Sequence, residues 1–287
     1  KWSVSGKRIN IFALKAGGIR SKKQIYCIGR LPVNPLIHLK PGIGGSNKPD
    51  TQAIIPSSTL SELMDIRPIT TQAAILVAQH TPLVVDTIEL PSNLDVGQVL
   101  VELQCSGICG SQLGEIDGVK GNDRYLPHLM GHEGFARVLE VGPGVRHVKV
   151  GDSVVLHWRP GAGIQSEPPR YRWRGKPLNA GWVTTFNQHA VVSENRCTTI
   201  PSGTDPDAAA LFGCAVTTGF GVVENNAKLK MGESVVVFGA GGIGLNIVQA
   251  AALVSAGPII AVDRFDSRLK LAQQMGATHC INSSSSD

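Results

Sequence analysis

The 287-residue sequence predicts an α/β protein with two structural parts, a partly open antiparallel β-barrel followed by a doubly wound parallel sheet. Between residues 72 and 192, short apolar or alternating segments recur with Gly- and Pro-containing turns between them, which is typical of antiparallel barrels. After residue 208, apolar strand segments alternate with helical segments. Such an alternation requires crossover connections and therefore a parallel sheet.

The barrel strands are expected where alternation and turn signals coincide. Residues 98–105, QVLVELQC, alternate apolar and polar side chains as a half-buried strand does. The other expected strands cover residues 73–78, 83–90, 134–141, 153–157 and 183–192, with a turn at 80–82 between the first two. Together these segments would form the catalytic half of the protein.

A long polar segment, residues 159–182, interrupts the strands and is expected to be a loop. Its aromatic residues stand beside basic ones, namely Tyr171, Trp173 and Trp182 beside Arg170, Arg172 and Arg174. Two interpretations stay open. The loop recognises an anionic or sugar-like substrate by stacking and forked hydrogen bonds, or it is a solvated surface loop.

The parallel part begins with a helix expected over 208–223, which carries Cys214. An apolar strand at 234–238, a glycine-rich turn and a helix to about residue 255 follow. A second strand at 258–262, a helix at 266–275 and a third strand at 279–282 complete the pattern.

The glycine-rich turn has the spacing of a dinucleotide-binding loop. Gly239 permits a tight turn, Gly241 lets the backbone approach a pyrophosphate, and Gly244 lets the helix pack closely on the strand. Asp263 closes the next strand, where a carboxylate binds the adenosine ribose and repels a 2′-phosphate. The sequence therefore predicts NAD as cofactor, in preference to NADP.

Residues 1–63 differ from the rest of the chain. They hold 10 Lys and Arg against 2 Asp and Glu, whereas residues 64–287 hold 17 against 20. The segment lacks a repeat, a sustained period or a motif. It is either a weakly ordered basic extension or a stretch that is not native, and the position of Met64 just before the first strand favours the second interpretation.

The mildly acidic remainder gives no reason to expect a nucleic-acid partner. No apolar run reaches the roughly 20 residues that a membrane span needs, and the N-terminus lacks a secretory pattern, so we expect a cytoplasmic protein without a membrane partner. The six cysteines are scattered along the chain, as in proteins of a reducing compartment.

A zinc site is indicated by Cys109, in a glycine-flanked turn, and by His132. Thiolate sulfur and neutral imidazole are preferred zinc ligands, and a catalytic site takes three protein ligands and keeps one open position. The best candidate for the third ligand is Cys214, just ahead of the glycine-rich turn.

Five motifs carry a resemblance to a known family: GICGSQ, GHEGFARVLEVGPGV, VGDSVV, GCAVTTGFG and VVVFGAGGIGLN. In this order they closely resemble the zinc-dependent alcohol dehydrogenases of the medium-chain dehydrogenase/reductase family, over about residues 72–282. The resemblance implies a GroES-like catalytic domain at 64–207 and a Rossmann domain at 208–287.

The resemblance also implies roles for individual residues. Cys109, His132 and Cys214 align with the zinc ligands, Ser111 with the hydroxyl that hands on the substrate proton, and Glu133 with the carboxylate beside the metal. Trp158 aligns with an aromatic residue of the substrate pocket. The cofactor-binding set comprises Gly239, Gly241, Gly242, Ile243, Gly244, Asp263, Arg264, Arg268 and Thr218.

Three departures from the family pattern stand out. Gln112 replaces an aspartate that usually hydrogen-bonds the zinc-bound histidine, so His132 must be oriented otherwise. Gly114 replaces a relay histidine, which leaves the proton exit open. The four-cysteine structural zinc lobe is absent, so one catalytic zinc per chain and no structural zinc is expected.

The expected function is that of a zinc-dependent oxidoreductase, which transfers a hydride between a small-molecule alcohol and NAD. The sequence holds about three of the six strands expected of the Rossmann sheet, so this domain is expected to be incomplete. The alternative is therefore a non-catalytic truncated or fused fragment that retains the zinc and nucleotide motifs. A homo-oligomer is expected for a full-length protein.

Overall fold

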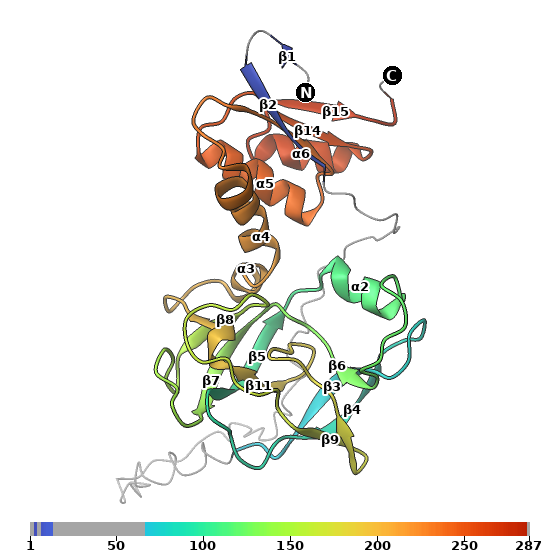
Figure 1. The fold of residues 1–287 in the computed structure, drawn as a ribbon, viewed down its shortest axis with the longest axis vertical. Coiled ribbons are helices and arrows are strands. Elements are labelled where there is room, and N and C mark those ends of the chain that lie inside the picture. The colour runs from blue at the N-terminus through green and yellow to red at the C-terminus, as the bar shows by residue number, and fades with distance from the viewer. Residues whose placement is uncertain (1–2, 5–6, 14–66, 286–287) are drawn as a thin grey trace, which may run out of the picture.

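The computed structural model describes residues 67–285 in full, together with the course of two N-terminal strands, residues 3–4 and 7–13. A β-barrel and a parallel sheet lie at opposite ends of this structure, and two short helices connect them (Figure 1). This arrangement confirms the predicted fold class of an antiparallel barrel joined to a parallel α/β sheet.

The barrel consists of two five-stranded sheets, with strand orders β10-β9-β4-β3-β6 and β11-β5-β7-β8-β12. Its strands are β3 (Thr70–Leu76), β4 (Val84–Glu89), β5 (Gln98–Ser106), β6 (His128–Leu129), β7 (Gly134–Val141), β8 (Ser153–Leu156), β9 (Tyr171–Trp173), β10 (Lys176–Leu178), β11 (His189–Ser193) and β12 (Cys197–Thr199). A 3₁₀-helix, η1 (Glu194–Arg196), separates the last two.

Residues 186–188 join the two sheets. Ala74 of β3 donates its backbone N–H to Phe186 (2.8 Å), and Leu103 of β5 donates to Gln188 (2.8 Å). The strand expected over 183–192 is therefore shorter, since its first residues bridge two sheets instead of following one. Apolar side chains such as Val101, Val138 and Leu156 face inward and are fully or almost fully buried.

The segment 159–182 is not a loop without secondary structure, as we had expected. It contains the hairpin of β9 and β10, turned by Arg174 and Gly175, both with positive φ (51° and 72°). Arg174 forms an ion pair with Asp86 (2.9 Å), and Arg172 lies 3.9 Å from Glu89.

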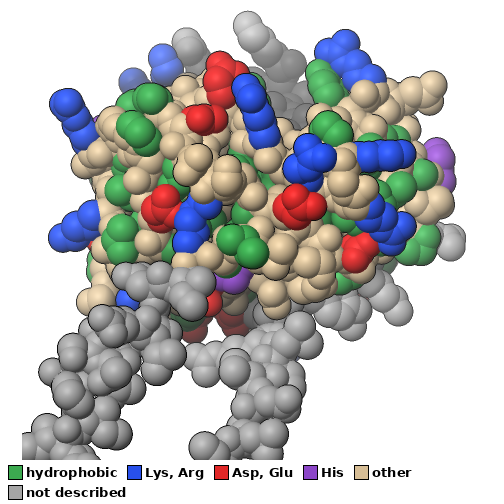
Figure 2. Space-filling model, turned by 90° about the horizontal axis from the view of Figure 1, so that it is seen from below, with side chains coloured by type: hydrophobic (Ala, Val, Ile, Leu, Met, Phe, Trp, Pro, Cys, Tyr) green, Lys and Arg blue, Asp and Glu red, His purple; other side chains and the backbone are tan. Residues whose placement is uncertain are grey.

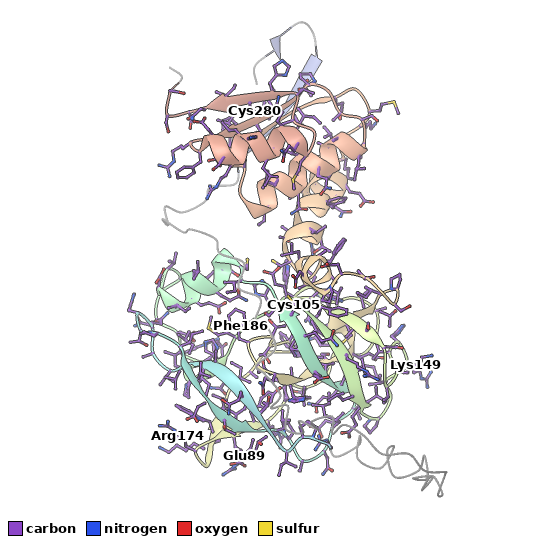
Figure 3. All side chains as sticks on the ribbon, turned by 180° about the vertical axis from the view of Figure 1, so that it is seen from behind. Glu89, Cys105, Lys149, Arg174, Phe186 and Cys280 are labelled. Carbon is purple, nitrogen blue, oxygen red and sulfur yellow. The ribbon has the colours of Figure 1, made fainter. Side chains whose placement is uncertain are left out.

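The hairpin arginines thus lie on the barrel surface. Figure 3 places Arg174 and Glu89 at the end of the barrel remote from the parallel sheet, while Cys105 lies on the side that faces it. Acidic and basic side chains are interspersed over this remote end (Figure 2). Substrate recognition by these arginines would require a site far from the metal ligands.

The second part contains three parallel strands, β13 (Ser234–Phe238), β14 (Ile259–Asp263) and β15 (His279–Asn282), in that order. They alternate with α5 (Gly242–Leu253) and α6 (Asp266–Gln274), which confirms the predicted pattern. The core between sheet and helices is built from small and branched residues, among them Val237, Ile247 and Ala272.

Two N-terminal strands extend this sheet. β2 (Lys7–Ala13) pairs in parallel with β13, and β1 (Ser3–Val4) pairs with β2. These residues belong to the segment 1–63, for which a weakly ordered or non-native extension was predicted. Most of that segment, and with it the test of this prediction, lies outside the described residues.

The prediction of a single helix over residues 208–223 is wrong. Three segments occupy this region: α3 (Pro206–Leu211), α4 (Ala215–Gly221) and the π-helical η2 (Val222–Ala227). Cys214 interrupts the helix with a backbone at φ −145°, ψ −68°. None of the helices in the described part of the chain is long and apolar enough to span a membrane.

Tyr171 ties the hairpin segment to the barrel core. Its side chain is almost completely buried, and its hydroxyl accepts the Val191 N–H (2.7 Å) and donates to the Val191 carbonyl (3.3 Å). Burial raises the pKa of Tyr171 to about 12, so the hydroxyl stays neutral.

We therefore expect Tyr171→Phe to lower the free energy of unfolding by about 1–3 kcal/mol, because two buried backbone groups lose their partner. Urea denaturation measures this difference. The control is Tyr125→Phe, since the Tyr125 ring is exposed and its hydroxyl contacts Arg124. Equal stability of the two variants would contradict the expectation.

Candidate metal centre

Four side chains with metal-binding atoms converge where the barrel meets the connecting helices. The ligand atoms of Cys109, His132, Glu133 and Cys214 all lie within 4.8 Å of one another. Glu133 and Cys214 are buried, whereas Cys109 and His132 are partly exposed. The structure thus brings together the three residues predicted as zinc ligands and the carboxylate predicted beside the metal.

The pairing of β5 and β7 places three of these residues. Ser106 at the end of β5 lies opposite Gly134 at the start of β7, so the residues after the first strand meet those before the second. The Gly107 N–H donates to the Glu133 carbonyl (3.1 Å) and extends the pairing by one step. Cys109 follows as the N-cap of α2 (Gly110–Ile116).

Gly213 allows Cys214 to reach the other ligands from the break between α3 and α4. A Cβ atom on Gly213 would lie 2.3 Å from the Leu156 carbonyl oxygen and 2.8 Å from the Glu133 Cα. Only glycine fits this approach, because both obstacles are backbone atoms.

The two sulfur atoms lie 3.8 Å apart, with the Cys214 thiol donating to Cys109. This hydrogen bond, together with smaller contributions from His132 and Ser111, lowers the pKa of Cys109 against the opposing influence of burial. The same contact raises the pKa of Cys214, because a second thiolate would stand next to the first. A bound cation would allow both thiols to ionise.

Gln112 supplies the contact to the histidine that the sequence led us to regard as missing. Its side chain is buried, and its Nε2 lies 2.7 Å from the His132 Nδ1. Its Oε1 accepts the backbone N–H of Cys109 (2.8 Å). A carboxamide therefore occupies the place of the usual carboxylate and orients both residues.

The donor set fits zinc. Two thiols and one imidazole form the Cys₂His combination of a catalytic zinc site, which keeps a fourth position for water or substrate. Ser111 Oγ is buried next to the Cys109 sulfur and has no oxygen or nitrogen partner among the described residues. A buried hydroxyl of this kind fits a role toward a group that binds at the fourth position.

The glycine-rich turn has the backbone that a dinucleotide loop requires. Gly239 has a φ of 92°, and a Cβ on Gly244 would lie 1.8 Å from the Gly239 carbonyl oxygen. No atom lies within 4 Å of a Cβ built on Gly241, the N-cap of α5, so the helix N-terminus is open to a ligand. Gly242 and Ile243 form the first turn of this helix.

Asp263 lies at the end of β14 and holds this loop. Its Oδ2 accepts the Ala240 N–H (2.8 Å) and lies 3.5 Å from Arg268, while its Oδ1 accepts the Phe265 N–H (3.0 Å). The guanidinium groups of Arg264 and Arg268 lie 5.8 and 4.8 Å from the centroid of the Phe265 ring. The predicted cofactor-binding residues of the loop and of β14 thus form one cluster.

Two further predicted residues lie near the metal ligands. Thr218 is one helical turn from Cys214, donates its N–H to the Cys214 carbonyl (3.0 Å) and hydrogen-bonds the Cys214 thiol through its side chain. Trp158 is exposed and donates its backbone N–H to Gly213 (3.4 Å).

Arg196 is a residue of this region that the sequence did not indicate. It is almost completely buried, donates to the Trp158 carbonyl and to Gln165 (3.2 Å), and lies 5.5 Å from the Trp182 ring. Within the described part of the chain it has no carboxylate partner. Its sequence context, ENRC, gave no signal, because such a segment usually forms an exposed turn.

We expect Gly213→Ala to weaken zinc binding by at least about 10-fold, because the added methyl group displaces Leu156 or Glu133 and thereby Cys214. Competition with a chromophoric chelator measures the affinity. Gly221→Ala in α4 is the control, since its Cβ would meet only the Asn225 amide nitrogen at 3.6 Å. Unchanged zinc affinity in Gly213→Ala would refute the steric argument.

Comparison with known proteins places these features in a family. The model of the alcohol dehydrogenase GroES-like domain matches residues 95–202, and that of the zinc-binding dehydrogenase matches residues 242–287. An S-(hydroxymethyl)glutathione dehydrogenase from Synechocystis is 36% identical in an alignment of 211 positions that covers 65% of this chain and 57% of the relative. The chain thus spans less than two thirds of that relative's length.

Comparison with solved structures leads to the same family. An alcohol dehydrogenase zinc-binding domain protein from Burkholderia ambifaria has a TM-score of 0.69 and 30% identity, over 76% of this chain and 65% of that one. An Escherichia coli alcohol dehydrogenase, solved with NADH, has a TM-score of 0.61 and 26% identity, over 76% and 64%. The chain belongs to the zinc-dependent, alcohol dehydrogenase-like proteins of the medium-chain dehydrogenase/reductase family.

Proposed function

We propose that the protein is an oxidoreductase that interconverts an alcohol and its carbonyl compound with zinc and NAD. The observation that carries the proposal is the convergence of Cys109, His132 and Cys214 within 4.8 Å, beside the buried Ser111 hydroxyl. When bound, zinc supplies Lewis-acid polarisation of the substrate oxygen, and NAD accepts or donates the hydride.

The side chains of the chain itself have separate tasks. Cys109, His132 and Cys214 hold one catalytic zinc ion, and no structural zinc is expected. Ser111 accepts a hydrogen bond from the substrate hydroxyl and, on taking up its proton, gives up its own hydroxyl proton to water; its hydroxyl is buried beside the ligands and has no oxygen or nitrogen partner among the described residues. Glu133, buried next to the three ligands, is the carboxylate that would exchange with water at the fourth position.

The cofactor lies on the second domain in this proposal. Backbone N–H groups of Gly241 and Gly242 at the start of α5 face the pyrophosphate, and Asp263 faces the adenosine ribose. Asp263 is already fixed by Ala240, Phe265 and Arg268, so its carboxylate is held in place for this contact. A fixed carboxylate favours NAD over NADP.

The substrate is a small alcohol or carbonyl compound, and an activity screen over a panel of such compounds would identify it. The curated relative is named for S-(hydroxymethyl)glutathione, so that compound belongs in the panel beside simple primary and secondary alcohols. Trp158, held by Arg196, is the pocket residue that we expect to influence the choice. Homo-oligomerisation and a cytoplasmic location are further proposals; none of the five cysteines in the described region forms a disulfide, which suits a reducing compartment.

We expect Cys214→Ser to abolish zinc binding and turnover. The loss should exceed the about 10- to 100-fold effect that is typical when only a residue hydrogen-bonded to a metal ligand is changed. Elemental analysis measures bound zinc, fluorescence titration measures NADH binding, and absorbance of NADH measures turnover. Cys280→Ser is the control, because Cys280 is an exposed free cysteine on β15.

Each measurement tests a separate part of the proposal. Retained turnover in Cys214→Ser would contradict the role of this residue. A native chain that binds neither zinc nor NADH would contradict the enzyme assignment and favour a non-catalytic product. NADH binding should persist in Cys214→Ser, because the dinucleotide loop and the metal ligands are separate groups of residues.

A further inference from the structure

The side-chain amide of Gln112 has a defined orientation, and this orientation has a consequence for His132. A backbone N–H only donates, so the atom of Gln112 that faces the Cys109 N–H at 2.8 Å is the accepting oxygen. The amide nitrogen then faces the His132 Nδ1 at 2.7 Å and donates to it. Nδ1 is therefore an acceptor and carries no proton.

A neutral imidazole with an unprotonated Nδ1 carries its proton on Nε2. Because Nδ1 faces Gln112, Nε2 is the ring nitrogen left to face the two sulfur atoms, and His132 hydrogen-bonds Cys109. All three contacts are satisfied in this pattern: Cys109 N–H to Gln112, Gln112 to Nδ1, and Nε2–H to sulfur. A metal ion, however, binds the unprotonated nitrogen.

Metal coordination through Nε2 would require the imidazole proton to lie on Nδ1. The Nδ1–H would then point at the amide N–H of Gln112, which places two donors against each other. Turning the Gln112 amide by about half a turn removes this conflict but creates the same conflict with the Cys109 N–H. Removing both imidazole protons instead would add a negative charge beside two thiolates, which is unfavourable.

We propose that Gln112 is a positioning residue that holds His132 in the tautomer unable to ligate through Nε2, so that metal loading breaks one hydrogen bond at this site. A carboxylate at residue 112 would accept from both the Cys109 N–H and the Nδ1–H and would have no such conflict. The consequence is a zinc centre that binds and releases its metal more readily than one backed by an acid. The inference rests on the proposed zinc site.

The test compares the native chain with Gln112→Glu, which changes the amide to a carboxylate of the same size. We expect Gln112→Glu to bind zinc about 10- to 100-fold more tightly and to release it more slowly to a chelator. Gln72→Glu on β3 is the control for an added negative charge, since Gln72 is exposed and contacts Thr87. Its zinc affinity should equal that of the native chain.

A second measurement needs no variant. Nitrogen-15 NMR of the native chain, stripped of metal, should show the His132 proton on Nε2, and zinc should move it to Nδ1. A proton on Nδ1 before zinc is added would overturn the inference, and so would equal zinc affinity of native and Gln112→Glu protein. Absence of zinc binding by both proteins would instead refute the proposed zinc site, while the NMR result still decides the tautomer.

Discussion

The structure depends on the close approach of ionisable groups that repel one another once they lose their protons. Two sulfur atoms 3.8 Å apart share their surroundings with the buried carboxylate of Glu133. Such a group is stable only if protons or a cation balance the charges. The pairing of β5 with β7, the cap of α2 by Cys109 and the break before α4 all serve to assemble it.

Much of the fold followed from local patterns. The alternation in β5 and the apolar runs of β13 and β14 predicted these strands, because burial of one or both faces of a strand determines which of its positions are apolar. The dinucleotide loop could equally be predicted from the sequence. Gly239 and Gly244 are required by a positive φ and by a 1.8 Å approach, and both requirements act within six residues of chain.

Other features depend on contacts between distant residues and left weaker signals. The helix breaks at Cys214 beside Gly213, which packs against the Leu156 carbonyl, and the alanine- and glycine-rich sequence does not reveal this distant contact. The turn at Arg174 was missed because a positive φ is uncommon for arginine. Gln112 was recognised as a departure from the family, but only the structure shows that its amide contacts His132.

The position of Cys214 also bears on how the two parts of the molecule move. α3, on one side of it, packs through Ala209 and Ala210 on the barrel, whereas α4, on the other side, packs closely on α5 through Gly219 and Asn246. A rotation of the parallel-sheet domain that used this junction as its pivot would displace the sulfur atom very little. The nucleotide loop, farther from the pivot, would sweep a longer arc. Rotation of the parallel-sheet domain and integrity of the ligand set would then be largely independent.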